Sequence, residues 1–126
     1  MTVKELYEQA KAMMFEKKSS KDYDGYYKPY INILLSENFD LNNNLRLSKG
    51  LAALTTRPTI SADTETLPYE DELNSEVLPK GLAMYFYIDD DLQKFNIFNT
   101  QYLNAQMMYQ KGIETAVADA YASSDD

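Results

Sequence analysis

The sequence predicts a small all-α protein. We expect a bundle of about four helices, with a long irregular loop between the second and third helices and an extended C-terminal segment. Apolar residues recur at three- and four-residue spacing over most of the chain, and no stretch alternates as a strand does. The chain has 126 residues, of which 44% are apolar, which suits one domain with a real core. Residues 1–112 are predicted to form the bundle, and residues 113–126 a C-terminal arm or tail.

The first helix is predicted to begin at Thr2. Thr2 and Glu5 stand at the spacing of a capping box, in which each side chain accepts a hydrogen bond from the other residue's backbone N–H. Apolar residues then follow helical spacing at Val3, Leu6, Tyr7, Ala10, Met13 and Met14. The polar run at residues 17–21 reads as a connector.

The second helix is predicted to begin near Asp22, with Pro29 in its first turns, where the missing N–H matters least. Its apolar face can extend through Leu47. Gly50 is then the expected stop, because glycine readily adopts the left-handed conformation that follows many helices.

Residues 51–67 read as a long irregular segment rich in Thr, Pro, Ser and Asp. Two interpretations are open. Loops of this length are often binding segments or arms. Alternatively, Leu54, Ile60 and Leu67 hold the segment against the core.

The third helix is predicted to begin between Pro68 and Asp71, and Pro79 with Gly81 should kink it or break it in two. Residues 82–88 are apolar on every side, whereas a surface helix needs only one apolar stripe. This segment is therefore either the centre of the bundle or covered on its second side by a neighbouring subunit.

The fourth helix is predicted to begin at the three aspartates 89–91, with Asp90 and Gln93 arranged like a capping box. Its apolar stripe runs from Phe95 and can continue through Ile113 and Val117. The last eight residues are small and acidic, and we expect them to fray when free.

Catalytic chemistry has few residue types to draw on. The chain has no His and no Cys, so the commonest general base and the commonest metal ligands are absent. The acidic runs at residues 70–72 and 89–91 stand where helices are predicted to begin, and capping with the helix dipole explains them. We therefore expect a protein that is not an enzyme and holds no cofactor and no metal.

Charge and aromatic content favour binding to proteins. The formal net charge is -8, and from Pro58 onward thirteen acidic residues face three basic ones, a balance that repels nucleic acid and anionic lipid. No apolar run reaches the roughly 18 residues that span a bilayer, so we expect no membrane partner. The eleven tyrosines suit protein interfaces or the edge of a core.

Four segments follow one another in a recognisable order, at residues 36–51, 67–73, 78–83 and 89–91, and they are followed by Phe95, Asn96 and Tyr102. In their order and spacing these motifs resemble the head–tail connector (adaptor) proteins of tailed bacteriophages and prophages of Gram-positive hosts. The resemblance implies a helical bundle that forms a ring, commonly of twelve copies. The ring docks under the portal at the capsid vertex.

The resemblance also implies a place and partners. The subunit would be in the host cytoplasm during assembly and then in the neck of the virion. There it would line the DNA channel and make only passive contact with the packaged DNA. Its partners would be copies of itself, the portal protein, and the next head-completion or tail protein. Candidate residues for the subunit or portal interface are Tyr26, Tyr27, Tyr30, Arg57, Ile60, Met84, Tyr87, Tyr109, Ile113, Val117 and Tyr121.

A second hypothesis stays open at this point. The acidic C-terminal portion also suits a regulatory protein of phage origin that mimics DNA and occupies a nucleic-acid-binding partner. Such binding would weaken with salt.

Overall fold

The computed structural model describes residues 1–124, and these residues form helices and connecting segments with no strand. The helices are α1 (Val3–Met13), α2 (Tyr27–Glu37), α3 (Phe39–Ser48), α4 (Asp71–Glu76), α5 (Leu78–Tyr87) and α6 (Leu92–Ser124). The all-α prediction is confirmed. Within this range there are six helices where about four were predicted, because the second and third predicted helices are each divided.

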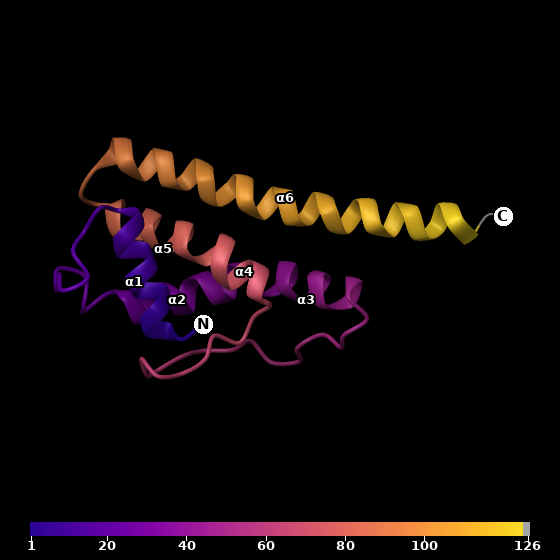
Figure 1. Ribbon diagram of the computed structural model, residues 1–126, viewed down its shortest axis with the longest axis horizontal. Helices are drawn as coiled ribbons and strands as arrows, with labels where there is room; N and C mark the ends of the chain where they lie inside the picture. Colours follow the sequence, from indigo (N-terminus) through magenta and orange to yellow (C-terminus); the bar gives the residue numbers. More distant parts are fainter. Residues whose placement is uncertain (125–126) are drawn as a thin grey trace.

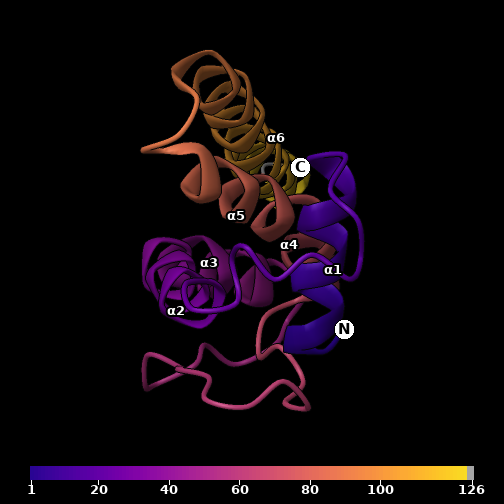
Figure 2. The same ribbon diagram turned by 90° about the vertical axis from the view of Figure 1, so that its left-hand side faces the viewer.

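Helix α5 lies at the centre of the molecule, in contact with α1, α2, α4 and α6 (Figures 1 and 2). Helix α6 runs along one side of the whole bundle, first over α5 and then beside α3, and its last turns project past the other helices (Figure 1). A helix of this length spans about 50 Å. The loop between α3 and α4 covers the opposite side (Figure 2).

The start of α1 matches its prediction. The backbone N–H of Glu5 donates to Thr2 Oγ1 at 3.2 Å, and the backbone N–H of Thr2 donates to Glu5 Oε1 at 3.1 Å. Both halves of the capping box are therefore present.

The second predicted helix begins later than expected and is interrupted at Asn38. Helix α2 begins at Tyr27, where Asp22 was predicted, and Pro29 lies in its first turn. The Asn38 side chain is fully buried, and its Nδ2 donates to the carbonyl of Leu34 at 2.9 Å and to the Tyr102 hydroxyl at 2.8 Å. Because this amide satisfies partners on α2 and α6, the chain bends there and resumes as α3.

The third predicted helix breaks as expected, into α4 and α5, with Val77 between them and Pro79 in the first turn of α5. Gly81 permits a close approach of three helices. A Cβ atom at this position would lie 2.4 Å from Leu34 Cδ2 and 3.0 Å from Tyr102 Cε1. Helix α5 therefore packs so closely against α2 and α6 that a larger residue would require the Leu34 side chain to shift.

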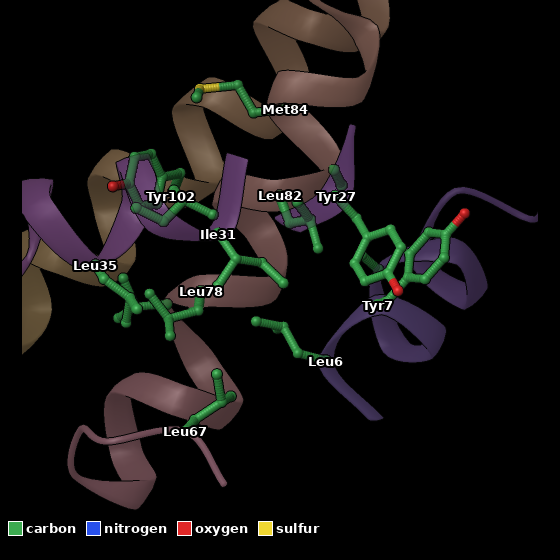
Figure 3. Packing of buried hydrophobic residues seen from close by; sticks show 14 of the residues in the cluster. Leu6, Tyr7, Tyr27, Ile31, Leu35, Leu67, Leu78, Leu82, Met84 and Tyr102 are labelled. Carbon is green, nitrogen blue, oxygen red and sulfur yellow. The ribbon is translucent and has the colours of Figure 1, made fainter. Parts of the chain in front are cut away.

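The all-round apolar character of residues 82–88 follows from the central place of α5. Leu82, Met84 and Tyr87 are at most 5% exposed and belong to the chain's own core (Figure 3 shows Leu82 and Met84). Of the two interpretations, burial by a neighbouring subunit is therefore wrong for these residues. Ile88, at the end of the segment, is half-exposed.

The irregular segment at residues 51–67 is held against the core. Ile60 and Leu67 are buried, and the Asn32 side chain bonds both backbone groups of Ile60, accepting from its N–H at 2.8 Å and donating to its carbonyl at 3.1 Å. The N–H of Leu67 donates to the carbonyl of Met1 at 2.9 Å. These contacts favour the pinned loop over the free arm.

Helix α6 is continuous across residue 112, so the described part of the predicted C-terminal arm extends the same helix. Residues 125–126 of that arm lie outside the described residues. At the other end, Asp91 rather than Asp90 caps the helix, with Oδ1 accepting from the backbone N–H of Lys94 at 3.1 Å.

Candidate interaction surface

Two sets of exposed apolar side chains lie near opposite ends of the molecule, and α6 connects them. One set lies where α1 ends beside the first turns of α6, and the other where α3 ends beside residues 110–118 of α6 (Figure 1). Between the two sets, α6 also exposes Leu103, Met107 and Met108. Along α6 the two sets are separated by about 25 Å. Large apolar residues left in water on a small chain point to a binding surface.

The first set is the Phe15 corner, which we define as the exposed Phe15 and Ile97 with the half-buried Met13 and Phe98 and the buried Met14 and Tyr87. These residues surround a hollow of about 410 Å³, with Lys94 and Gln101 at its edge. Phe15 is 98% exposed and Ile97 is 51% exposed. The Phe15 ring therefore stands almost entirely in water.

Phe15 also has an unusual backbone. It follows α1 in the left-handed conformation, with φ at 61°. Its N–H donates to the carbonyl of Ala12 at 3.1 Å, and the N–H of Glu16 donates to the carbonyl of Lys11 at 2.9 Å. This pair of bonds is a Schellman motif, whose left-handed position is usually glycine. A bulky side chain there is a genuine conformational outlier.

The connector that follows Phe15 is held by a buried lysine. Lys11 is 4% exposed, and its Nζ donates to the carbonyls of Lys18 at 2.7 Å and Ser20 at 3.1 Å. The same Nζ lies 4.1 Å from the centre of the Tyr7 ring. Lys11 thereby fixes the turn from which Phe15 projects.

The second set is the α3–α6 groove, which we define as the hollow of about 550 Å³ between the end of α3 and residues 110–118 of α6. Its apolar walls are Leu47 on α3 and Ile113 and Val117 on α6. Leu47 is 58% exposed and Val117 is 47% exposed. The polar residues on its rim are Asn44, Ser48, Gln110 and Glu114.

The end of α3 is a second Schellman motif, with Gly50 in the left-handed position at φ 78°, as predicted. The N–H of Gly50 donates to the carbonyl of Leu47 at 3.0 Å, and the N–H of Leu51 donates to the carbonyl of Arg46 at 2.9 Å. Lys49 pairs with Glu70 at 3.2 Å, which ties this end to the segment before α4.

Most of the tyrosine cluster is packed within the chain. The rings of Tyr7 and Tyr27 stack at 4.1 Å between centroids, and those of Tyr23 and Phe86 at 4.4 Å (Figure 3 shows the first pair). Burial raises the pKa of Tyr23 to about 12. Of the four tyrosines at the predicted start of the second helix, only Tyr26 is mainly exposed, at 59%.

A buried polar junction joins α6 to the break between α2 and α3. The Tyr102 hydroxyl donates to Glu37 Oε1 at 3.0 Å and accepts from Asn38, whose Oδ1 accepts from Gln106 at 2.8 Å. Tyr85 donates to the other Glu37 oxygen at 2.8 Å. Burial, and then the Glu37 charge, raise the pKa of Tyr102 above its ordinary value. Both tyrosines are therefore held protonated as donors, which suits a structural role.

The predicted interface residues fall into three groups. Tyr26, Arg57, Val117 and Tyr121 are exposed, and Tyr30, Tyr109 and Ile113 are half-buried. The core buries the other four, which are Tyr27, Ile60, Met84 and Tyr87. The prediction that these four residues contact a partner is therefore corrected. Of the eleven, the α3–α6 groove brings together Ile113 and Val117.

Arg57 already has partners within the chain. It donates to the carbonyl of Ser36 at 3.0 Å and lies 4.8 Å from the centre of the Phe39 ring. These contacts hold the loop against the junction of α2 and α3.

Sequence reasoning missed Phe15 and Leu47 as exposed residues at the two ends. The signal for Phe15 was its position, since a large aromatic residue stands between the last helical turn and a polar connector, where glycine or a polar residue is usual. Leu47 was assigned to the buried face of the second helix. The break at Asn38 rotates it outward.

Within residues 1–124 no group of three or more His, Cys, Asp or Glu side chains is arranged to hold a metal ion. In the same range, every helix is too short or too polar to cross a bilayer.

Comparison of the chain with protein-family models, with curated proteins and with solved structures finds no match.

Proposed function

We propose that this chain is a structural subunit of a head–tail connector in a tailed-phage virion. In this role it assembles with its own copies into a ring on the portal at the capsid vertex, and it offers a platform for the next head-completion or tail protein. It works by binding, with no substrate turned over. The proposal starts from the motif resemblance and depends on the surface for its physical support.

One observation carries the proposal: exposed apolar surface lies at two opposite ends of a single small bundle. A ring subunit must bury one surface against the copy before it and a different surface against the copy after it. A binder with a single partner needs one such surface. The Phe15 corner and the α3–α6 groove supply two surfaces that differ in shape.

The acidic composition is compatible with a channel that DNA passes through. A net charge of -8 repels the phosphate backbone, so DNA slides past such a wall without being held.

The alternative of an acidic DNA mimic receives less support from the ion pairs. A mimic needs carboxylates that face outward unpaired. Glu70 pairs with Arg46 at 3.1 Å and with Lys49 at 3.2 Å, and Glu72 pairs with Lys49 at 2.5 Å. Much of the acidic surface near α4 is therefore neutralised within the chain.

Negative-stain electron microscopy of the purified protein, alone and mixed with its portal, tests the proposal. We expect rings that cap the portal. A protein that stays monomeric at high concentration and leaves portal rings bare would refute it. Salt-sensitive binding to a basic protein, lost when Asp119, Asp125 and Asp126 are changed to asparagine, would favour the DNA mimic instead.

A further inference from the structure

Phe15 combines two features that folding alone does not explain. Its ring is 98% exposed, and its backbone occupies a left-handed conformation that glycine would adopt at lower free energy. We infer that Phe15 is a contact residue for a second copy of this chain, and that its ring inserts into the α3–α6 groove of that copy. The inference deepens the proposed function and rests on it for the choice of a second copy as the partner.

The two surfaces match in chemistry. Phe15 presents an aromatic ring with apolar neighbours, Met13 and Ile97, at its base. The groove has apolar walls in Leu47, Ile113 and Val117, and its volume of about 550 Å³ leaves room for a ring. Exposed aromatic side chains that enter a pocket are typical anchors of protein interfaces.

The two ends also carry opposite charge. Residues 11–21, which surround Phe15, contain four lysines and one glutamate. Residues 114–126, which follow the groove on α6, contain four acidic residues and no basic residue. Within residues 1–124 neither Lys17 nor Glu114 forms an ion pair. Bringing one end of a copy to the other end of its neighbour therefore joins opposite charges.

The placement of the two surfaces fixes the type of contact. Because Phe15 and the groove lie at opposite ends of one subunit, each copy can bind one neighbour through Phe15 and another through the groove (Figure 1). Such a head-to-tail contact closes into a ring, or continues as a filament, according to the rotation between copies. In a two-fold dimer both contacts would form at once by symmetry, and no further copy could join, so a ladder of higher multimers distinguishes the head-to-tail contact.

Cross-linking tests the contact directly, because the chain has no cysteine of its own. Ala12→Cys places a thiol on the exposed side of the turn before Phe15, and Ala118→Cys places one at the groove. With a short bis-maleimide, a mixture of the two variants should give cross-linked dimers, and the double variant should give a ladder of higher multimers. Each single variant alone should give almost none.

Two controls decide what the cross-links mean. Thr59→Cys, on the exposed loop, should not cross-link with either variant. Adding Phe15→Gly to Ala12→Cys should abolish the cross-link, and sedimentation of Phe15→Gly alone should show self-association at least about tenfold weaker, as expected for loss of an aromatic anchor. Because glycine suits the backbone there, this loss cannot come from misfolding.

The possible outcomes separate this inference from the proposed function. Rings that form without a link between Ala12→Cys and Ala118→Cys would overturn the contact while leaving the connector role intact. Strong links of either single variant to itself would also overturn it, in favour of a two-fold contact. If Ala118→Cys links only to an added portal subunit, the groove belongs to the portal and the inference is wrong.

Discussion

The ends of α1 and α3 close with the same backbone motif but with different residues. Both are Schellman motifs whose left-handed residue follows the C-cap, and this residue is Gly50 after α3 and Phe15 after α1. Glycine makes the motif at little cost, whereas a bulky residue loses about 1 to 2 kcal/mol. The backbone of the turn after α3 is therefore unstrained, and the turn after α1 gives up stability to hold an aromatic ring in water.

Each end is also tied by a cation to the segment that follows. At α3, Arg46 Nε donates to the carbonyl of Ala52 at 2.7 Å. At α1, the buried Lys11 binds two carbonyls of the connector. Both turns are therefore held by a cation that binds backbone carbonyls, although the left-handed residue is favourable only in the turn at Gly50.

The largest expected effect comes from removing the buried tie at α1. Lys11→Met leaves the carbonyls of Lys18 and Ser20 without their donor, so the free energy of unfolding should fall by about 2 to 3 kcal/mol. Urea unfolding measures it. Lys17→Met, at an exposed lysine of the same connector, is the matched control and should change stability by less than about 0.5 kcal/mol. Equal effects of the two variants would show that Lys11 does not hold the turn.

Replacing Gly50 by phenylalanine gives the turn after α3 the same left-handed residue as the turn after α1. Gly50→Phe should lower the free energy of unfolding by about 1 to 2 kcal/mol, because φ at this residue is 78°. Gly25→Phe is the matched control, because the space around Gly25 is open and its φ is not in the left-handed region. It should lower the free energy of unfolding by less. If Gly50→Phe were as stable as the wild type, the assumed strain at Phe15 would lose its basis.

The reverse exchange should have the opposite sign. Phe15→Gly should raise the free energy of unfolding by about 0.5 to 1 kcal/mol, since relief of the left-handed strain exceeds the added flexibility of the unfolded chain. Phe15→Ala keeps a side chain in the strained conformation and should not gain. The measurement belongs at low protein concentration, where self-association adds nothing to stability. Destabilisation by Phe15→Gly would contradict the comparison.

Acid should loosen the end of α3. A hydrogen bond from Lys49 lowers the pKa of Glu72 below its ordinary value. A lowered carboxyl pKa stabilises the fold above the ordinary pKa, and this contribution is lost as the pH falls through the lowered value. Because the pair is partly exposed, the loss should be a few tenths of a kcal/mol below about pH 4.

Thermal unfolding at neutral and acid pH checks this effect. Wild type should lose slightly more stability in acid than Glu72→Gln, which lacks the titrating group. Identical pH profiles would mean that the pair with Lys49 contributes nothing.

Short sequence motifs correctly predicted where helices begin, end or break. The Thr2 capping box, the stop at Gly50 and the break near Pro79 each depend on local backbone chemistry, and all three are present. The break at Asn38 was missed because its cause lies far along the chain. Asn38 bonds Tyr102 and Gln106, more than sixty residues away, and no local pattern indicates that pairing.

The candidate surface was harder to predict than the fold. An apolar residue in a sequence looks the same whether the bundle covers it or not, which is why Met84 and Tyr87 were assigned to an interface although α5 lies at the centre. Phe15 was missed for the opposite reason. It follows the apolar stripe of α1, and only the left-handed turn directs it away from the core.

The close packing around Gly81 contributes to the angle between α5 and α6. Tyr102 lies against that glycine in the first half of α6, and the helix continues without interruption past both apolar surfaces. In a head-to-tail assembly, the direction of α6 would set how one surface is oriented relative to the other. We expect that a methyl group added at Gly81 would shift this direction and change the curvature of the assembly, without altering a residue at either contact.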